Sequence, residues 1–323
     1  SYCRFSVSVA HTDRTRVQSP GCISWRSIAF IALIWGGAFM VVRVALRDFA
    51  PLSLAAGRIT IGALSLYMLM HWRGVALPSL TDARLWRFVI LVGLLSSAIP
   101  FASLSWGQQH VPSAFAGMTM AALPIFVLPL AHFLVPGERV YMRKIIGFSV
   151  GFLGAILLIG TSGLGLAEGS LEATARFACV AAAFCYACGS IATRQCPPVN
   201  ELALSTASLI VAALILVPIA LVVDGWPPMP STTGLFAILY LGLIPTALAF
   251  TIKVAVIRSA GPSFMTLTNY QVPVWAVLFG SLFLGETLPA ILFVALALIL
   301  LGVAIIQEGV LRSIFSFGQP PKA

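Results

Sequence analysis

The densest run of polar side chains inside an apolar stretch begins at Thr266 and ends at Pro273. Thr266, Asn269, Tyr270 and Pro273 follow i, i+3, i+4 spacing, so a helix places them on one face, and Gln271 adds a second amide. Buried amides need hydrogen-bond partners, which neighbouring helices or a bound solute can supply. A proline inside a helix also frees a carbonyl one turn back. The run predicts either a wall of a solute cavity or polar packing between helices.

Two arginines, Arg43 and Arg58, fall about 6–11 Å inside apolar stretches at 1.5 Å per residue. One of them could attract a substrate carboxylate. Because an arginine stem can extend to the membrane surface, the alternative is a pair of anchors that bond loop carbonyls or Asp48. Lys253, near the inner end of its stretch, is expected to be an inner-surface anchor.

Aromatic and hydroxyl side chains elsewhere are candidates to enclose the apolar part of a solute. We expect at least half of them to serve packing alone. These candidates are Trp35, Tyr186, Ser97, Phe101, Thr246 and Phe250.

Four residues are candidates for gating or hinge motion: Pro124, Pro273, Glu138 and Glu286. The two prolines would loosen their helices. Each glutamate follows a glycine at the end of an apolar stretch. Such an acid is either a gate or a helix-terminal group that organises a tight turn, and the turn is the favoured interpretation.

All ten acidic residues fall in predicted loops, tails or last helical turns. A carrier that exchanges lipophilic cations for protons typically needs a buried carboxylate. The sequence therefore predicts poor transport of bare cations and no carboxylate-centred proton relay. Of the four histidines only His132 is considered for proton handling, and no metal site or cofactor is expected. The Cys185–Cys188 pair is read as small packing residues because no further ligands accompany it.

The composition indicates that this chain lies in a lipid bilayer. Its 323 residues are 59% hydrophobic and 9% charged, with a mean hydropathy of +1.01. A soluble domain has about 25% charged residues, so the bilayer must cover most of this surface. The net charge of +9 does not indicate a nucleic-acid partner, because the basic residues lie in loops between apolar stretches.

The fold class expected is an all-α integral membrane protein with ten transmembrane helices. Residues 1–26 are expected to form a disordered cytosolic tail, and residues 310–323 a second tail. The two five-helix repeats are expected at 27–162 and 163–309. The predicted spans are 27–47, 51–71, 86–107, 112–134, 143–162, 173–194, 201–223, 233–255, 262–284 and 289–309.

The second five stretches repeat the first five at an offset of 148–151 residues. Because five is odd, the second copy must enter the membrane inverted. Inverted repeats with a site near the midplane are typical of secondary transporters. The matched pairs are Trp35 with Tyr186, Arg43 with Arg194, Gly93 with Gly242, Phe101 with Phe250, Pro112-Ser113 with Pro262-Ser263, Pro124 with Pro273, Gly137-Glu138 with Gly285-Glu286, and Gly154 with Gly302.

The basic residues also predict orientation. With the N-terminus inside, 15 of the 19 Lys and Arg lie on the cytoplasmic side. This asymmetry predicts a multi-pass protein of the bacterial inner membrane with both termini cytoplasmic.

The chain resembles the EamA-like exporters of the drug/metabolite transporter superfamily over residues 27–309. The resemblance rests on Trp35-Gly36 with Phe39 and Arg43, on Arg58 after Pro51, and on Pro124 and Gly137-Glu138, which recur as Pro273 and Gly285-Glu286. It implies a central cavity lined by the first four helices of each repeat, with the fifth and tenth helices at the periphery. It also implies export of small metabolites, with the aromatic and neutral amino-acid exporters closest.

The sequence thus predicts a secondary transporter and no enzyme. It would export amino acids by alternating access, as a monomer or a homodimer. No phosphate-binding GxxxxGK[ST] loop is present, so ATP is not the direct energy source. The alternatives are a nucleotide-sugar or drug carrier of the same fold and, in a different class, a membrane-embedded lipid enzyme. The lipid enzyme would need clustered acids, histidines or metal ligands that this sequence does not group.

Overall fold

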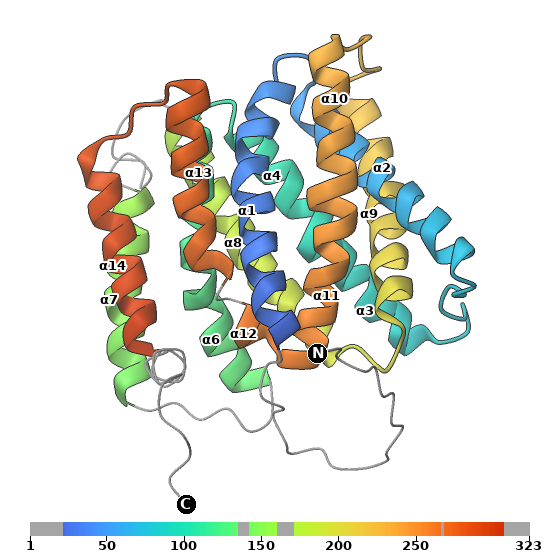
Figure 1. The fold of residues 1–323 in the computed structure, drawn as a ribbon, viewed down its shortest axis with the longest axis horizontal. Helices are drawn as coiled ribbons and strands as arrows, with labels where there is room; N and C mark the ends of the chain where they lie inside the picture. Colours follow the sequence, from blue (N-terminus) through green and yellow to red (C-terminus); the bar gives the residue numbers. More distant parts are fainter. Residues whose placement is uncertain (1–21, 135–141, 160–170, 266–267, 307–323) are drawn as a thin grey trace, which may run out of the picture.

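The structure is a computed structural model that describes residues 22–134, 142–159, 171–265 and 268–306. These residues are helical and contain no β-strand (Figure 1). In the first half the helices are α1 (Cys22–Ala45), α2 (Pro51–Trp72), α3 (Ala83–Gly93), η1 (Leu94–Ala98), α4 (Ile99–Gly107), α5 (Ser113–Thr119), η2 (Met120–Ala122), α6 (Leu123–Leu134) and α7 (Met142–Ile159). In the second they are α8 (Leu171–Gln195), α9 (Glu201–Val223), α10 (Thr232–Leu241), η4 (Gly242–Leu248), α11 (Ala249–Ala260), α12 (Pro262–Met265), α13 (Thr268–Leu284) and α14 (Ala290–Ile306).

Seven continuous helical runs in the described part are long and apolar enough to cross a membrane. They overlap the first four, the sixth, the seventh and the eighth predicted spans, and four of them extend one to four residues beyond the predicted ends. Three shorter apolar helices occupy the other predicted spans: Ile145–Leu157, Gln271–Leu284 and Ala290–Gly302.

Polar caps and prolines set the helix boundaries. Asp82 accepts a hydrogen bond from the backbone of Leu85 at 2.9 Å, which begins α3. Asn200 caps α9 in the same way, and Pro51 is the first residue of α2, where its missing N–H costs no helical hydrogen bond. Each of these three helix starts is therefore explained by the residue type at that position.

Two π-helical segments occupy equivalent places in the halves, η1 and η4. Pro245 lies within η4, and Pro100 is the second residue of α4, which follows η1. A proline lacks the N–H that an α-helix needs at that point, so the backbone widens locally. In η4 the Thr246 hydroxyl donates to the carbonyl of Leu241 at 2.7 Å and satisfies part of the freed backbone.

Helices from the two halves pack against each other in a matched way. Helix α1 packs on α13, and α8 packs on α4 and α6, while α2 packs on α9. Helices α7 and α14 form an edge of the bundle on the left of Figure 1. There Gly302 lies against the backbone of Gly147 and Gly151, so the two helices approach closely.

At one end of the bundle, three carboxylates join the halves. Asp48 accepts from the backbone of Ser231 at 3.0 Å, and Asp224 accepts from that of Ser53 at 2.7 Å. Glu286 accepts from the first residues of α5. Each acid thus binds the start of a helix in the other half, where unpaired N–H groups and the helix dipole favour a negative charge.

Candidate functional site

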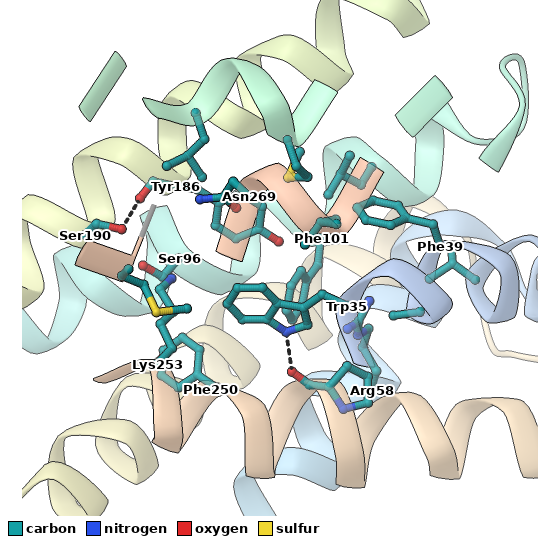
Figure 2. Close-up of a pocket in the computed structure, with 18 of the residues that line it drawn as sticks. Trp35, Phe39, Arg58, Ser96, Phe101, Tyr186, Ser190, Phe250, Lys253 and Asn269 are labelled. Atoms are coloured by element: carbon teal, nitrogen blue, oxygen red, sulfur yellow. Dashed lines mark hydrogen bonds between the residues drawn. The ribbon is translucent and has the colours of Figure 1, made fainter. Parts of the chain in front are cut away.

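A cavity of about 860 Å³ of empty space, part of it open to the outside, lies between the two halves (Figure 2). Both halves supply its walls. Its lining residues are Trp35, Ala38, Phe39, Val42, Arg58, Ser96, Phe101, Leu104, Ser105, Gln108, Met120, Leu123, Tyr186, Ser190, Pro245, Phe250, Lys253, Pro262, Met265, Asn269 and Val272.

Aromatic rings form much of the wall. Phe101 and Tyr186 meet edge to face with their ring centroids 6.4 Å apart. The indole of Trp35 donates to the carbonyl of Pro245 at 3.2 Å, the bond drawn in Figure 2. Because Pro245 belongs to η4, this bond fixes an aromatic side chain of the first half to the widened helix of the second.

Arg58 is buried in this wall, with 6% of its surface exposed. Its Nε donates to the hydroxyl of Thr246 at 3.1 Å, and its guanidinium carbon lies 3.9 Å from the centroid of Phe101. Contact with a ring face stabilises a cation by about 0.5–2 kcal/mol. The guanidinium is thus positioned, yet none of the described acids forms an ion pair with it.

Lys253 is the second buried cation, with 4% of its surface exposed. Its Nζ lies 5.3 Å from the ring centroid of Tyr186 and 5.4 Å from that of Phe250. The sequence analysis expects this lysine to be an inner-surface anchor, but its side chain lines the cavity instead. The long stem follows the aromatic wall inward rather than outward.

Several buried polar atoms in the lining have no hydrogen-bond partner within the described part of the chain. They are the hydroxyls of Ser96 and Ser105 and both amide atoms of Gln108. Each of these residues is at most 1% exposed. Buried polar groups normally bond to protein, water or ligand, so these atoms can bond to what fills the cavity.

Among the residues that the structure describes, no acid lines the cavity. The described acids lie elsewhere, at Asp48, Asp82, Glu172, Glu201, Asp224 and Glu286. With Arg58 and Lys253 in the wall, the cavity is electropositive. Such a site attracts anions and repels cations.

The structure brings six of the predicted binding residues together in the lining: Trp35, Arg58, Phe101, Tyr186, Phe250 and Asn269. Arg43 instead donates to the backbone carbonyl of Gln108, and Thr246 holds Arg58. Ser97 is buried outside the lining and Gln271 is half-buried outside it.

The predicted hinge prolines, Pro124 in α6 and Pro273 in α13, are buried but do not line the cavity. Thr266 and Glu138 lie outside the described residues, as does the side chain of Tyr270.

Sequence reasoning missed Gln108, Ser105 and Ser190. Gln108 closes the last turn of α4, where a polar residue is expected at a membrane surface and gives no signal of a site. The repeat offset did hold a signal for Ser190, because the 151-residue offset that pairs Trp35 with Tyr186 also pairs Phe39 with Ser190.

Comparison with known proteins shows relatives over most of the chain. An uncharacterized inner membrane transporter, YedA of Escherichia coli, is 28% identical over 279 residues, which cover 86% of this chain and 88% of the relative. A probable terminal-alkyne amino-acid exporter of Streptantibioticus cattleyicolor is 25% identical, with 87% and 92% covered. A probable amino-acid metabolite efflux pump of Salmonella typhimurium is 24% identical, with 89% and 93% covered.

A solved crystal structure shares the fold, with a TM-score of 0.63 and 21% identity. The match covers 88% of this chain and 96% of that one. The profile of the EamA-like transporter family matches twice, at residues 25–160 and 174–307. Each match spans one half of the helical bundle that encloses the cavity. The chain is therefore a multi-pass membrane transporter that belongs to the EamA-like transporter family.

Proposed function

We propose that this transporter exports small metabolites that carry a carboxylate, amino acids in particular, through the cavity between its halves. The observation that carries the proposal is the cavity itself. It combines aromatic walls, which suit an apolar side chain, with Arg58 and Lys253, which suit a carboxylate. The printed names of two relatives, an amino-acid exporter and an amino-acid metabolite efflux pump, support this substrate class.

Within this proposal each end of an amino acid has partners. The carboxylate would bind the guanidinium of Arg58 through charge-assisted hydrogen bonds. The amine would donate to the oxygens of Asn269 and Gln108, while an apolar side chain would lie against Phe101 and Tyr186. Asn269 is 5% exposed and faces the cavity in Figure 2.

Transport would proceed by alternating access, with the halves rocking about the cavity. The two family matches and the matched packing of α1 on α13 and α8 on α6 support a ten-helix arrangement with inverted repeats. The acid contacts of Asp48, Asp224 and Glu286 would hold one end closed. With both termini cytoplasmic, that end faces outward from the inner membrane.

A nucleotide-sugar carrier needs basic residues in its cavity, and Arg58 and Lys253 meet that condition. They lie against different rings, Arg58 on Phe101 and Lys253 on Tyr186, and so do not form one basic cluster of the kind that a diphosphate needs. The amino-acid proposal is therefore preferred.

Flux into proteoliposomes tests the proposal. The purified chain would be offered labelled amino acids, a nucleotide sugar and a cationic dye, each with and without a pH gradient. Saturable flux of amino acids, with little flux of the dye, is expected. Saturable flux of the dye or the nucleotide sugar, with none of the amino acids, would overturn the proposal.

A further inference from the structure

The cavity contains two buried basic side chains, whereas the proposed amino-acid cargo has one carboxylate. Arg58 and Lys253 are both at least nine-tenths buried, and no described acid lines the space between them. An uncompensated charge is costly inside a membrane, and ionisable residues there usually serve function. A single carboxylate would leave one of the two cations unmatched.

The fold does not itself require either charge. The 149-residue offset that pairs Phe101 with Phe250 also pairs Leu104 with Lys253. Leu104 lines the cavity from the first half as an uncharged residue. The equivalent position is thus built without a cation in the same chain, so packing at this position does not require the charge of Lys253.

The same argument applies to Arg58. Gly242 packs against the backbone carbonyl of Arg58, and its repeat partner Gly93 packs against the backbone of Ser208. Ser208 is therefore the structural equivalent of Arg58, and it is uncharged and fully buried. Each cation occurs once, in one half only, so the charge pattern belongs to an asymmetric ligand site.

The two cations are held apart. Arg58 bonds Thr246, and Lys253 lies seven residues further along the same helical run. Seven residues make two helical turns, so Thr246 and Lys253 lie on the same face of their helical run. At 1.5 Å per residue they are about 10 Å apart. In Figure 2 Lys253 lies to the left of the Trp35 ring and Arg58 to its right.

We propose, building on the function proposed above, that the preferred cargo is a small organic dianion with an acidic group at each end of an apolar middle. One acid would pair with Arg58 and the other with Lys253. The apolar middle would lie along Phe101 and Tyr186, while the unpartnered amide of Gln108 and hydroxyl of Ser105 would bond remaining oxygens. Adjacent acids, as in a diphosphate, would reach only one cation.

Proteoliposome flux with matched ligands tests this inference. The probes are α,ω-dicarboxylates from succinate to sebacate, the monoamide of each, and phenylalanine as a zwitterion. A monoamide keeps the length and shape of its diacid and removes one charge. We expect saturable diacid flux with an optimum at intermediate length, at least tenfold above the matching monoamide.

Lys253→Met supplies the second arm, because methionine keeps much of the stem without the charge. It should abolish the preference for the diacid, so that diacid flux falls to the level of monoamide flux in the same variant. The control is Arg87→Gln, which removes one positive charge from an exposed residue outside the cavity and should leave the preference unchanged. A single symmetric peak in size-exclusion chromatography would confirm that each variant is folded. If Lys253→Met fails this check, the wild-type comparison of diacid with monoamide decides alone.

Four results would overturn the inference. Monoamide flux equal to diacid flux in the wild type is one, and a diacid preference that survives in folded Lys253→Met is another. Phenylalanine flux without diacid flux would reject the dianion and leave the proposed amino-acid function standing. If no carboxylate of either kind moves in a folded protein, the proposed function fails as well.

Discussion

Glu286 accepts a hydrogen bond at 2.8 Å from the backbone N–H of Ser113, although 173 positions separate the two residues. Its other oxygen accepts from Ala114 at 2.9 Å. The sequence analysis favoured a local role for this acid in a tight Gly-Glu turn, and Gly285 does adopt φ +65° there. The carboxylate, however, caps a helix of the other half, which is a contact that a gate would have to break.

Replacing Glu286 with Gln should loosen that end of the bundle. The amide keeps the shape but loses the charge that the start of α5 favours, at a cost of about 0.5–2 kcal/mol. In a cysteine-free background, Ser113→Cys should react faster with an impermeant maleimide when Glu286 is Gln. Glu172→Gln is the control, since Glu172 pairs with Arg176 on its own helix. Equal labelling rates in all three backgrounds would remove Glu286 from gating.

Thr246→Val should weaken substrate binding, although residue 246 does not itself contact the substrate. Valine keeps the volume but cannot accept the hydrogen bond from Arg58, which a buried charged donor makes worth about 1.5–3 kcal/mol. We expect KM to rise about tenfold and kcat to change less. Thr246→Ser restores the acceptor and should recover the wild-type KM. An unchanged KM in Thr246→Val would mean that Arg58 needs no such positioning.

Asn269→Ala and Gln271→Ala should distinguish the contributions of two neighbouring amide side chains to transport. Asn269 lines the cavity and Gln271 does not, so only the first should reduce flux, by about tenfold. Both variants remove a similar amide, which makes each the control for the other. Equal losses would assign the polar run a packing role or place both residues in the site.

Gly302→Ala should lower stability and leave transport selectivity intact. A methyl group there would lie 2.7 Å from the Cα of Gly151 and meet the backbone of Gly147 as well. Overpacking of this kind costs about 1–3 kcal/mol. The melting temperature in detergent should fall while the KM for a transported carboxylate stays the same. A changed KM with an unchanged melting temperature would contradict a peripheral role for α7 and α14.

Much of the fold could be predicted from the sequence, because membrane-spanning helices are recognisable by their length and hydropathy. Pro51 and Asp82 mark helix starts, and each of the seven long apolar runs overlaps one predicted span. The three remaining apolar helices are shorter than a full span in the described residues, so the ten-helix count stays a prediction. The π-helical segments were not predicted. Pro100 and Pro245 indicate an interruption of the α-helix, but they do not indicate that the interruption is π-helical.

The aromatic part of the site was also accessible to sequence reasoning. Matching Trp35 with Tyr186 and Phe101 with Phe250 picked out four residues that all line the cavity. For Lys253 the sequence favours an inner-surface anchor, because the long side chain of a lysine near a helix end can extend outward or inward. The direction of the Lys253 side chain is set by Tyr186. Tyr186 belongs to another helix, so the sequence pattern around Lys253 does not reveal this contact.

The most direct test of the account asks whether solute passes through this cavity. Ser105 is 1% exposed and lines it, so Ser105→Cys in a cysteine-free protein places a small reactive group in the proposed path. A thiol reagent small enough to enter should abolish carboxylate flux in proteoliposomes, and transported carboxylate should slow the labelling. Arg87→Cys, outside the cavity, should be labelled without loss of flux. Full labelling of Ser105→Cys with wild-type flux would contradict the account.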